Sequence, residues 1–488
     1  MRMRNLTLLT DLYELTMLQG YHRNRNDEVV VFDMFFRANP FQSSYSIMAG
    51  LKQVMDYIEN LHFSDADVDY LRSLKLFDED FLHYLKDFRF TGDIYAAEEG
   101  RLIFPHEPIL KVIAPIAQAQ LIETAVLNII NHQCLIATKA SRVAYVAGDD
   151  RLMEFGLRRA QGPDAGIYGA RAAVIGGFHA TSNVLAGQMF DIPVAGTHAH
   201  SWIMSFPSEY DAFKAYANLY PNACILLVDT YNTLKSGLPN AIRVFAEMRD
   251  AGIKPETYGI RLDSGDLAYL SKEARKMLDA AGFSDAIISA SNDLDENLIL
   301  TLKAQGARVN AWGVGTNLIT AKDNPSFGGV YKLSAIRAAD GSYKPKIKLS
   351  DNPAKITNPG NKKVYRIIDK DTGKLRADYI CLEHEQIHEG MELVLFDPTN
   401  TWKRTILSPN TYTLKKLLQP IFIDGERVYD APSIPDIRAR CKRELDLLWS
   451  ESRRFLNPQL PYVDLSQELY DLRNTLYFEY FNRRKPTP

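Results

Sequence analysis

Short apolar runs recur through the middle of the chain, and each ends abruptly in polar or glycine residues. Seven runs have about the length of a buried strand, and they span residues 152–157, 192–195, 225–228, 258–260, 287–290, 309–312 and 330–336. Helical patterns lie between them, the clearest at 266–282, where leucine, alanine and methionine recur on one face. Strands that alternate with helices predict parallel βα units.

Parallel βα units close into a barrel or form an open wound sheet. Seven runs are one fewer than a complete βα barrel needs. In a barrel all the strand ends meet at one face, whereas an open sheet concentrates its ligand site at one crevice. Because every run ends in polar residues, we favour an irregular α/β barrel of about seven strands over residues 151–337.

The flanking segments have a different pattern. Residues 1–150 predict an N-terminal α+β domain, with a strand near 29–37, helices over 45–88 and a long apolar helix over 117–148. Residues 338–430 are strand-rich and basic, and part of 338–400 is expected to complete that domain. Residues 401–488 are expected to form a C-terminal, mostly helical extension that contains a charged helix at 434–456.

Composition narrows the functional classes. The chain has 488 residues and a net charge of −3, which gives no sign of a basic surface for nucleic acid. No run approaches 18 apolar residues, and the first residues lack the apolar core of a signal peptide, so no membrane association is expected. Four scattered cysteines show no disulfide or zinc spacing. We therefore expect a reduced, cytoplasmic protein.

The run at 192–195 leads into Gly-Thr-His-Ala-His-Ser at Gly196–Ser201. A strand that ends in such residues delivers reactive side chains to its C-terminal mouth. Two histidines in one strand-end loop favour a site, and His200 can serve as a general base, a metal ligand or a phosphoryl acceptor.

Charged residues follow other runs. Arg158 and Arg159 follow the first run, and Arg261, Asp263 and Asp266 follow the fourth. An arginine at a strand end suggests an anionic ligand, because a guanidinium binds carboxylate or phosphate bidentately. The alternative is a structural ion-pair network that joins Arg158 or Arg261 to Asp229, Asp263 or Glu154.

Two further motifs suggest ligand sites, and only the first is in a suitable position. Gly313-Val314-Gly315-Thr316 follows a late strand, where glycines let backbone N–H groups approach phosphate oxygens. His384–His388 matches the H-E-x-x-H zinc pattern, but it lies between two strand-like runs with too little room for the helix that this site requires. We interpret it as a loop, and no metal ligand is certain.

Several motifs in one order resemble the nicotinate phosphoribosyltransferase family. The likeness runs from residue 6 to about 366 and continues more weakly to the C-terminus. It is carried by the segments 10–13, 99–100, 104–108, 156–162, 196–201, 229–231, 236–240, 261–267 and 313–316.

The resemblance implies a type II phosphoribosyltransferase fold and a homodimer with shared active sites. It implies an ATP-dependent, ligase-type reaction of nicotinate with phosphoribosyl pyrophosphate, which gives nicotinate mononucleotide and pyrophosphate in NAD salvage. ATP is a co-substrate, and Mg²⁺ is expected with the pyrophosphate.

Residue roles follow from the same matching. His200 is expected to be phosphorylated, and Asp229 to stabilise the positive charge that develops on the ribose. Tyr13, which helical spacing alone would place in the core, is expected to stack on the pyridine ring. The remaining expected substrate contacts are Arg158, Thr197, Ser201, Arg261, Asp263, Asn292, Gly313, Gly315 and Thr316.

Two other functions stay open. A nicotinamide phosphoribosyltransferase on the same fold would not need the charge of Arg261, because a neutral amide does not repay a buried cation. A non-catalytic nucleotide sensor would use the barrel mouth for binding only.

Overall fold

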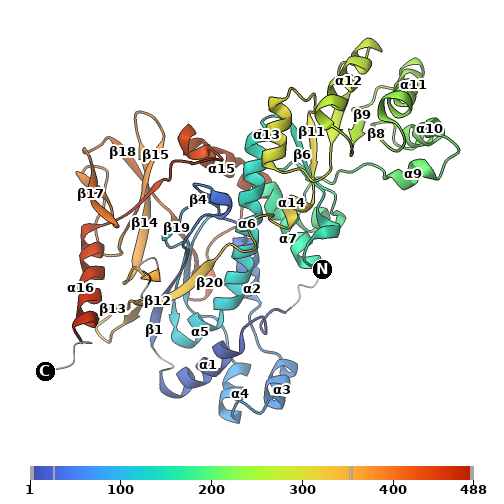
Figure 1. The fold of residues 1–488 in the computed structure, drawn as a ribbon. Helices are drawn as coiled ribbons and strands as arrows, with labels where there is room; N and C mark the ends of the chain where they lie inside the picture. Colours follow the sequence, from blue (N-terminus) through green and yellow to red (C-terminus); the bar gives the residue numbers. More distant parts are fainter. Residues whose placement is uncertain (1–4, 26–27, 351, 353–354, 484–488) are drawn as a thin grey trace. The chain divides into compact units, whose positions relative to one another are not determined.

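The computed structural model describes residues 5–25, 28–350, 352 and 355–483. The chain divides into two compact units, one formed by Met1–Leu135 with Ser326–Pro488 and the other by Ile136–Pro325 (Figure 1). Helix α6 (Glu123–Ala147) carries the chain from the first unit into the second. In the described residues, the strands of each unit pair only with strands of the same unit.

The second unit is built on a six-stranded sheet of order β7-β6-β11-β10-β9-β8. All its neighbouring strands are parallel. The strands are β6 (Arg151–Glu154), β7 (Ala180–Thr181), β8 (Ala223–Leu227), β9 (Thr257–Leu262), β10 (Ile287–Ala290) and β11 (Ala311–Val314). The sheet curls as a half-barrel whose two edges are β7 and β8.

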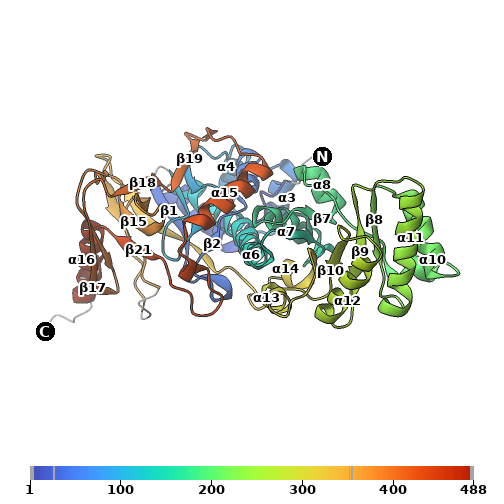
Figure 2. The ribbon, with the colours of Figure 1, turned by 90° about the horizontal axis from the view of Figure 1, so that it is seen from above.

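Helices connect these strands and cover the sheet. They are α7 (Pro163–Ile175), α8 (Val184–Phe190), α9 (His200–Met204), α10 (Glu209–Leu219), α11 (Leu238–Asp250), α12 (Leu267–Ala280), α13 (Glu296–Ala304) and α14 (Thr316–Ile319). Short helical turns lie at Leu157–Arg159 and Thr233–Gly237. Figure 2 shows α10, α11 and α12 beside β8 and β9. Helix α12 begins where the Asp266 carboxylate accepts the Tyr269 N–H at 2.9 Å, so Asp266 has a structural role as an N-cap.

The predicted α/β class and curled parallel sheet are confirmed, but one run was assigned to the wrong sheet. Residues 330–336 lie in β12 (Gly329–Arg337), which pairs antiparallel with β1 (Val29–Phe36) and β13 (Tyr343–Pro345) in the first unit. An apolar run shows that a strand is buried but carries no information about its partners. The run 192–195 forms only an isolated parallel bridge, between Thr181 and Val194.

The first unit contains a seven-stranded sheet of order β13-β12-β1-β5-β3-β19-β20 and a four-stranded sheet of order β18-β14-β15-β21. The strands of the first sheet are β1 (Val29–Phe36), β3 (Asp93–Ala97), β5 (Leu110–Pro115), β12, β13 (Tyr343–Pro345), β19 (Leu418–Ile423) and β20 (Glu426–Arg427). Those of the second are β14 (Lys362–Asp369), β15 (Leu375–Leu382), β18 (Tyr412–Lys416) and β21 (Tyr462–Leu465). Two further antiparallel pairs join β2 (Ser46–Ile47) to β4 (Leu102–Ile103), and β16 (Leu393–Asp397) to β17 (Asn400–Leu407).

Three helices of the first unit, α1, α3 and α4, lie close together (Figure 1). The helices of this unit are α1 (Leu12–Asn24), α2 (Leu51–Glu59), α3 (Asp65–Ser73), α4 (Glu79–Lys86), α5 (Ile116–Leu121), α15 (Ile434–Leu447) and α16 (Gln467–Arg483). Short 3₁₀ turns lie at Pro40–Gln42 and Ser450–Arg453. In the described part of the chain, no helix has both the length and the apolar character that a bilayer crossing needs.

The H-E-x-x-H segment is a loop after β15, as expected. His384 Nε2 lies 2.8 Å from Glu468 Oε1, and residues 384–388 form no helix that would place His384 and His388 on one face.

The compact units end at Leu135 and Pro325, whereas the sequence places domain boundaries at residues 150, 337 and 400. The predicted C-terminal extension contains α15 and α16 but also several strands, and its β19 pairs with β3. The predicted division into domains stays a prediction.

Candidate functional site

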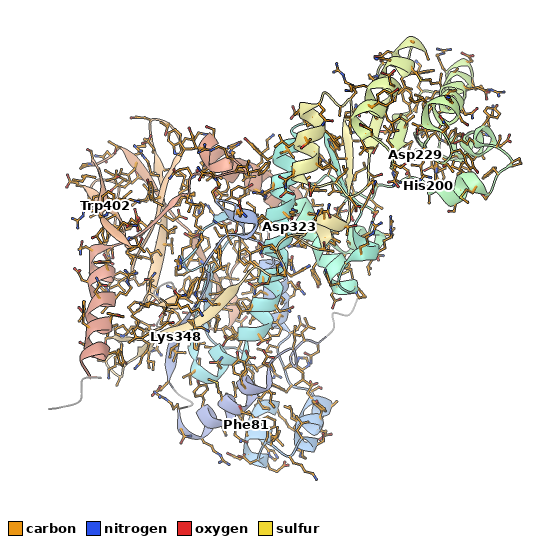
Figure 3. The ribbon with its side chains drawn as sticks, in the orientation of Figure 1. Phe81, His200, Asp229, Asp323, Lys348 and Trp402 are labelled. Carbon is orange, nitrogen blue, oxygen red and sulfur yellow. The ribbon has the colours of Figure 1, made fainter. Side chains whose placement is uncertain are left out.

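Four parallel strands of the second unit bring their carboxyl ends to one edge of the sheet. Strand β8 leads to Asp229, β9 to Asp263, β10 to Ser291 and β11 to Gly315. Neighbouring parallel strands point the same way, so the residues that follow them lie close together. Figure 3 shows His200 and Asp229 near each other at this edge.

The guanidinium of Arg261 is the centre of the cluster, and three oxygens hold it. Its Nε donates to Ser291 Oγ at 2.8 Å, its Nη1 to Thr197 Oγ1 at 3.1 Å, and its Nη2 to Asp263 Oδ1 at 2.9 Å. A guanidinium has five N–H donors, so two remain available on the outer nitrogens. Three oxygens therefore fix the orientation of Arg261 and leave it two N–H donors.

Asp263 connects this cation to the neighbouring residues. Burial raises the pKa of its carboxyl, but the hydrogen bond from Ser291 and the nearby charges of Arg261 and His200 outweigh burial and lower the pKa overall. Ser291 also donates to the same oxygen that Arg261 binds. Asp263 is thus held as a carboxylate between two positively charged or chargeable groups.

The carboxylate of Asp229 lies beside that of Asp263, and only one of its two oxygens accepts hydrogen bonds in the described residues. Its Oδ2 accepts the Asp263 N–H at 2.8 Å and the Ser264 hydroxyl at 2.6 Å. Its Oδ1 is buried and has no hydrogen-bond partner among the described residues. A buried acceptor without a donor indicates a group that a bound ligand would satisfy.

His200 opens helix α9 and reaches the cluster from the loop after residue 195. Its Nδ1 lies 3.1 Å from Thr230 Oγ1, and its Nε2 lies 3.8 Å from Asp263 Oδ2. The side chain is 40% exposed, so a ligand can reach it. A hydroxyl thus lies within hydrogen-bond distance of one ring nitrogen, and a carboxylate lies somewhat farther from the other.

Phe155 provides an aromatic face beside the cation. The Arg261 guanidinium lies 5.9 Å from the centroid of the Phe155 ring. A Cβ on Gly313 would lie 2.6 Å from two carbons of this ring, and a Cβ on Gly315 would lie 3.1 Å from the Phe155 carbonyl oxygen. Both glycines are therefore needed where Phe155 approaches β11, which is a packing role beside their expected phosphate role.

The arginines after β6 lie apart from these contacts. Arg158 is exposed on the turn Leu157–Arg159, and no described contact joins it to Arg261. Glu154 is buried and accepts from Gly156 and Thr181, so it forms no ion pair with either arginine in the described residues. Of the ion pairs that the alternative interpretation offered, the structure contains the one between Arg261 and Asp263.

Three other expected contacts line the same edge without joining the hydrogen-bond cluster. Ser201 is exposed on α9, and Thr316 is half-buried at the start of α14. Asn292 is exposed after β10 with a φ of 90°, the left-handed conformation that asparagine tolerates better than most residues. Their roles toward a substrate stay predictions.

Tyr13 belongs to the first unit and is 46% exposed on α1, which contradicts the core position that helical spacing alone would give it. Burial and the nearby carboxylates of Glu123 and Glu14 raise the pKa of its hydroxyl. The adjacent Glu14 is fully buried and accepts the Thr124 N–H at 3.0 Å, which fixes α1 against the start of α6. The ring of Tyr13 is thus presented on an anchored helix.

Sequence reasoning did not assign a role to Phe155, His198, Thr230 or Ser291. Phe155 lies within the run 152–157, and each of the others stands next to a residue that was singled out. That position was the available signal, but their contacts depend on which strands are neighbours.

The described residues contain no group of three or more histidine, cysteine or acidic side chains arranged to hold a metal. The carboxylates of Asp229 and Asp263 are the hard oxygen ligands that Mg²⁺ prefers, and a Mg²⁺ here would also need oxygens from a bound phosphate.

Three family models match the chain in order. They describe the nicotinate phosphoribosyltransferase N-terminal domain at residues 8–131, the nicotinate phosphoribosyltransferase family at 151–376, and its C-terminal domain at 361–473.

Individual relatives agree with these matches. The nicotinate phosphoribosyltransferase of Bacillus subtilis (strain 168) is 50% identical over 467 residues, which cover 96% of this chain and 94% of the relative. The Homo sapiens nicotinate phosphoribosyltransferase is 34% identical over 528 residues and covers 96% of both chains. The crystal structure of human nicotinic acid phosphoribosyltransferase matches with a TM-score of 0.84 at 32% identity, over 96% of this chain and 100% of that chain. The chain therefore belongs to the nicotinate phosphoribosyltransferase family.

Proposed function

We propose that this chain transfers the phosphoribosyl group of phosphoribosyl pyrophosphate to nicotinate, in the salvage of NAD. The pyridine nitrogen forms a bond to the ribosyl carbon, the bond from that carbon to the pyrophosphate oxygen breaks, and nicotinate mononucleotide and pyrophosphate leave. The observation that carries the proposal is the Arg261 guanidinium, held by three oxygens beside an aromatic ring.

Arg261 supports nicotinate over nicotinamide. A planar guanidinium matches a carboxylate bidentately, and its fixed orientation lowers the entropy cost of that match. Nicotinamide would leave the cation without a counter-charge beyond Asp263, so it would gain less from the same contact.

Asp229 and Asp263 support the sugar chemistry. The ribosyl carbon becomes positively charged as its bond to pyrophosphate breaks, and preorganised carboxylates stabilise such a charge. The free Oδ1 of Asp229 is suited to this role or to a Mg²⁺. A bound Mg²⁺ would neutralise the pyrophosphate as it leaves.

His200 is the proposed site of ATP coupling, which makes the reaction ligase-type. When the Nδ1–H of His200 donates a hydrogen bond to Thr230 Oγ1, the lone pair of Nε2 is free to attack the terminal phosphorus of ATP. A bond then forms from nitrogen to phosphorus, the terminal phosphoanhydride bond breaks, and ADP leaves. Water later removes the phosphoryl group, so His200 is regenerated.

The proposed assembly is a homodimer with shared active sites, and the proposed compartment is the cytoplasm. In this assembly Tyr13 stacks on the pyridine ring of nicotinate, and Arg158, Ser201, Asn292 and Thr316 contact the substrates. All four cysteines are buried and none forms a disulfide in the described residues, which is typical of a reducing compartment.

Purified protein should be given phosphoribosyl pyrophosphate and Mg²⁺ with nicotinate or nicotinamide, with and without ATP, while mononucleotide and pyrophosphate are measured. We expect nicotinate mononucleotide and pyrophosphate in equal amounts, and a higher yield with ATP. Preference for nicotinamide would favour the amide-specific enzyme. Nucleotide binding without any pyrophosphate release would favour a non-catalytic sensor.

A further inference from the structure

The curled sheet of the second unit has a seam between its edge strands β7 and β8, and residues 192–198 run along it. On the β7 side, these residues pair with the strand as a short parallel bridge. The Thr181 N–H donates to the Pro193 carbonyl at 3.0 Å, and the Ala195 N–H donates to the Thr181 carbonyl at 3.0 Å. This side of the seam is closed by ordinary backbone pairing.

On the β8 side, a side chain takes the place of the backbone. The Leu227 N–H donates to Nε2 of His198 at 3.3 Å. The next residue, Val228, bonds β9 by donating to the Arg261 carbonyl. Successive residues of a strand bond opposite neighbours, so the Leu227 N–H faces the open edge. The imidazole satisfies a donor that would otherwise lie unpaired on this edge.

The surroundings of His198 hold its ring in that position. The residue is 8% exposed, and its ring meets Tyr216 of α10 edge-on with centroids 4.6 Å apart. Burial lowers the pKa of His198 to about 4, a backbone interaction with Ala199 opposes this, and the charges of Arg261 and His200 add to the lowering. The imidazole is therefore neutral near pH 7, and only the neutral ring has a nitrogen that can accept.

The residues on both sides of His198 belong to the candidate site. Thr197 accepts from Arg261 at 3.1 Å, and His200 lies 3.1 Å from Thr230 on the segment that follows β8. The bond between His198 and Leu227 thus links residues 197–200 to the backbone of β8.

We propose that His198 is a positioning residue whose imidazole closes the seam of the half-barrel and so places Thr197 and His200 for the reaction. The inference rests on the proposed function for its kinetic consequence, but the closure itself does not depend on it. Displacement of reacting groups by about 1 Å costs on the order of 100-fold in rate, so a weak structural bond can have a large kinetic effect.

Two variants separate the hydrogen bond from the packing. His198→Phe keeps a flat ring against Tyr216 but removes the acceptor, whereas His198→Gln keeps an acceptor on a flexible chain. His132→Phe is the matched control, because it replaces a partly buried histidine of the first unit. Hydrogen exchange by mass spectrometry on the full chain follows peptides that contain Leu227, with β10 peptides as the internal reference.

For His198→Phe we expect faster exchange at Leu227 with unchanged β10 peptides, a 10- to 100-fold loss of kcat/KM for nicotinate per folded molecule, and a matching loss of His200 phosphorylation by ATP. His198→Gln should recover most of both losses, and His132→Phe should change neither. A variant that is merely less stable would lose folded fraction but keep kcat/KM per folded molecule.

Unchanged exchange at Leu227 in His198→Phe would overturn the closure, and faster exchange with kcat/KM within about 2-fold of the wild type would overturn the positioning role. If His198→Phe does not fold, ¹⁵N spectra of histidine-labelled wild type decide the point. A neutral ring protonated on Nδ1 and assigned with His198→Gln supports the bond, and protonation on Nε2 overturns it. If the wild type makes no nicotinate mononucleotide, the proposed function fails while the exchange data still decide the closure.

Discussion

Replacement of Arg261 by lysine tests the recognition of nicotinate most directly. The change keeps a positive charge at the end of β9 but removes the planar fork. In the native site the fork is spread over Ser291, Thr197 and Asp263, with distances of 2.8, 3.1 and 2.9 Å. The lysine ammonium can keep the ion pair with Asp263, but it cannot also reach the hydroxyls of both Ser291 and Thr197.

The size of the effect follows from these contacts. A hydrogen bond to a charged group contributes about 1.5–3 kcal/mol, and lysine would present one point donor where arginine presents two parallel ones. We therefore expect Arg261→Lys to weaken nicotinate binding by about 1–3 kcal/mol, which corresponds to roughly 5- to 150-fold. KM for phosphoribosyl pyrophosphate should change much less.

The assay is steady-state kinetics with each substrate varied in turn, and with nicotinamide as the competing base. Arg275→Lys is the control, because this arginine also forms several hydrogen bonds but lies before β10, at the opposite end of the strands, where it binds Asp279 and the Ala286 carbonyl. The control should leave KM for nicotinate unchanged. An unaltered KM for nicotinate in Arg261→Lys, with an unaltered preference over nicotinamide, would refute the assignment of Arg261 to the carboxylate.

Three further predictions concern single residues. His200→Ala should abolish the stimulation of product yield by ATP, measured as mononucleotide formed with and without ATP, and unchanged stimulation would contradict the assignment. Gly313→Ala places a Cβ 2.6 Å from the ring of Phe155, so it should cost about 1–3 kcal/mol by overpacking and lower the melting temperature, whereas Gly20→Ala, with no neighbour within 4 Å, should not. The pKa of His198 is about 4 in the fold and about 6.5 when unfolded, so the unfolded chain binds its proton first as the pH falls below 6.5. His198 should therefore cost about 2 kcal/mol of stability at pH 5 and almost nothing at pH 7, a difference that His198→Gln removes from the melting temperatures at the two pH values.

Much of the second unit could be predicted from the sequence, because its strands are short apolar runs with polar ends. Five of the seven runs became strands of the parallel sheet, and the polar ends of β8 and β9 did meet. Length and patterning identify such strands because both faces of a covered parallel sheet are buried. The run at 330–336 has the same pattern, yet it pairs with β1, since pairing depends on contacts distant in sequence.

The expected site residues divide in the same way. Arg261 and Asp263 were recognisable because charged residues directly after buried strands need a partner. Ser291, which completes the cluster, is an ordinary serine in sequence and gains its role only because β10 lies beside β9. Phe155 likewise has the pattern of one more residue of an apolar run. Its contact with the Arg261 guanidinium was not expected from the sequence.

The strand predicted at residues 192–195 forms only an isolated bridge, and it leads to the least expected feature of the site. The segment has the composition of a strand, and β7 accepts it as one through the bridge at Val194. Its backbone does not pair with β8. Instead, His198 accepts the hydrogen bond of the Leu227 N–H through its side chain. A fully paired strand would hold every backbone group of this segment, and a free loop would hold none. In the positioning role proposed for His198, a single side-chain bond fixes this segment to β8 and leaves its backbone free to present Thr197 and His200 to the strand ends.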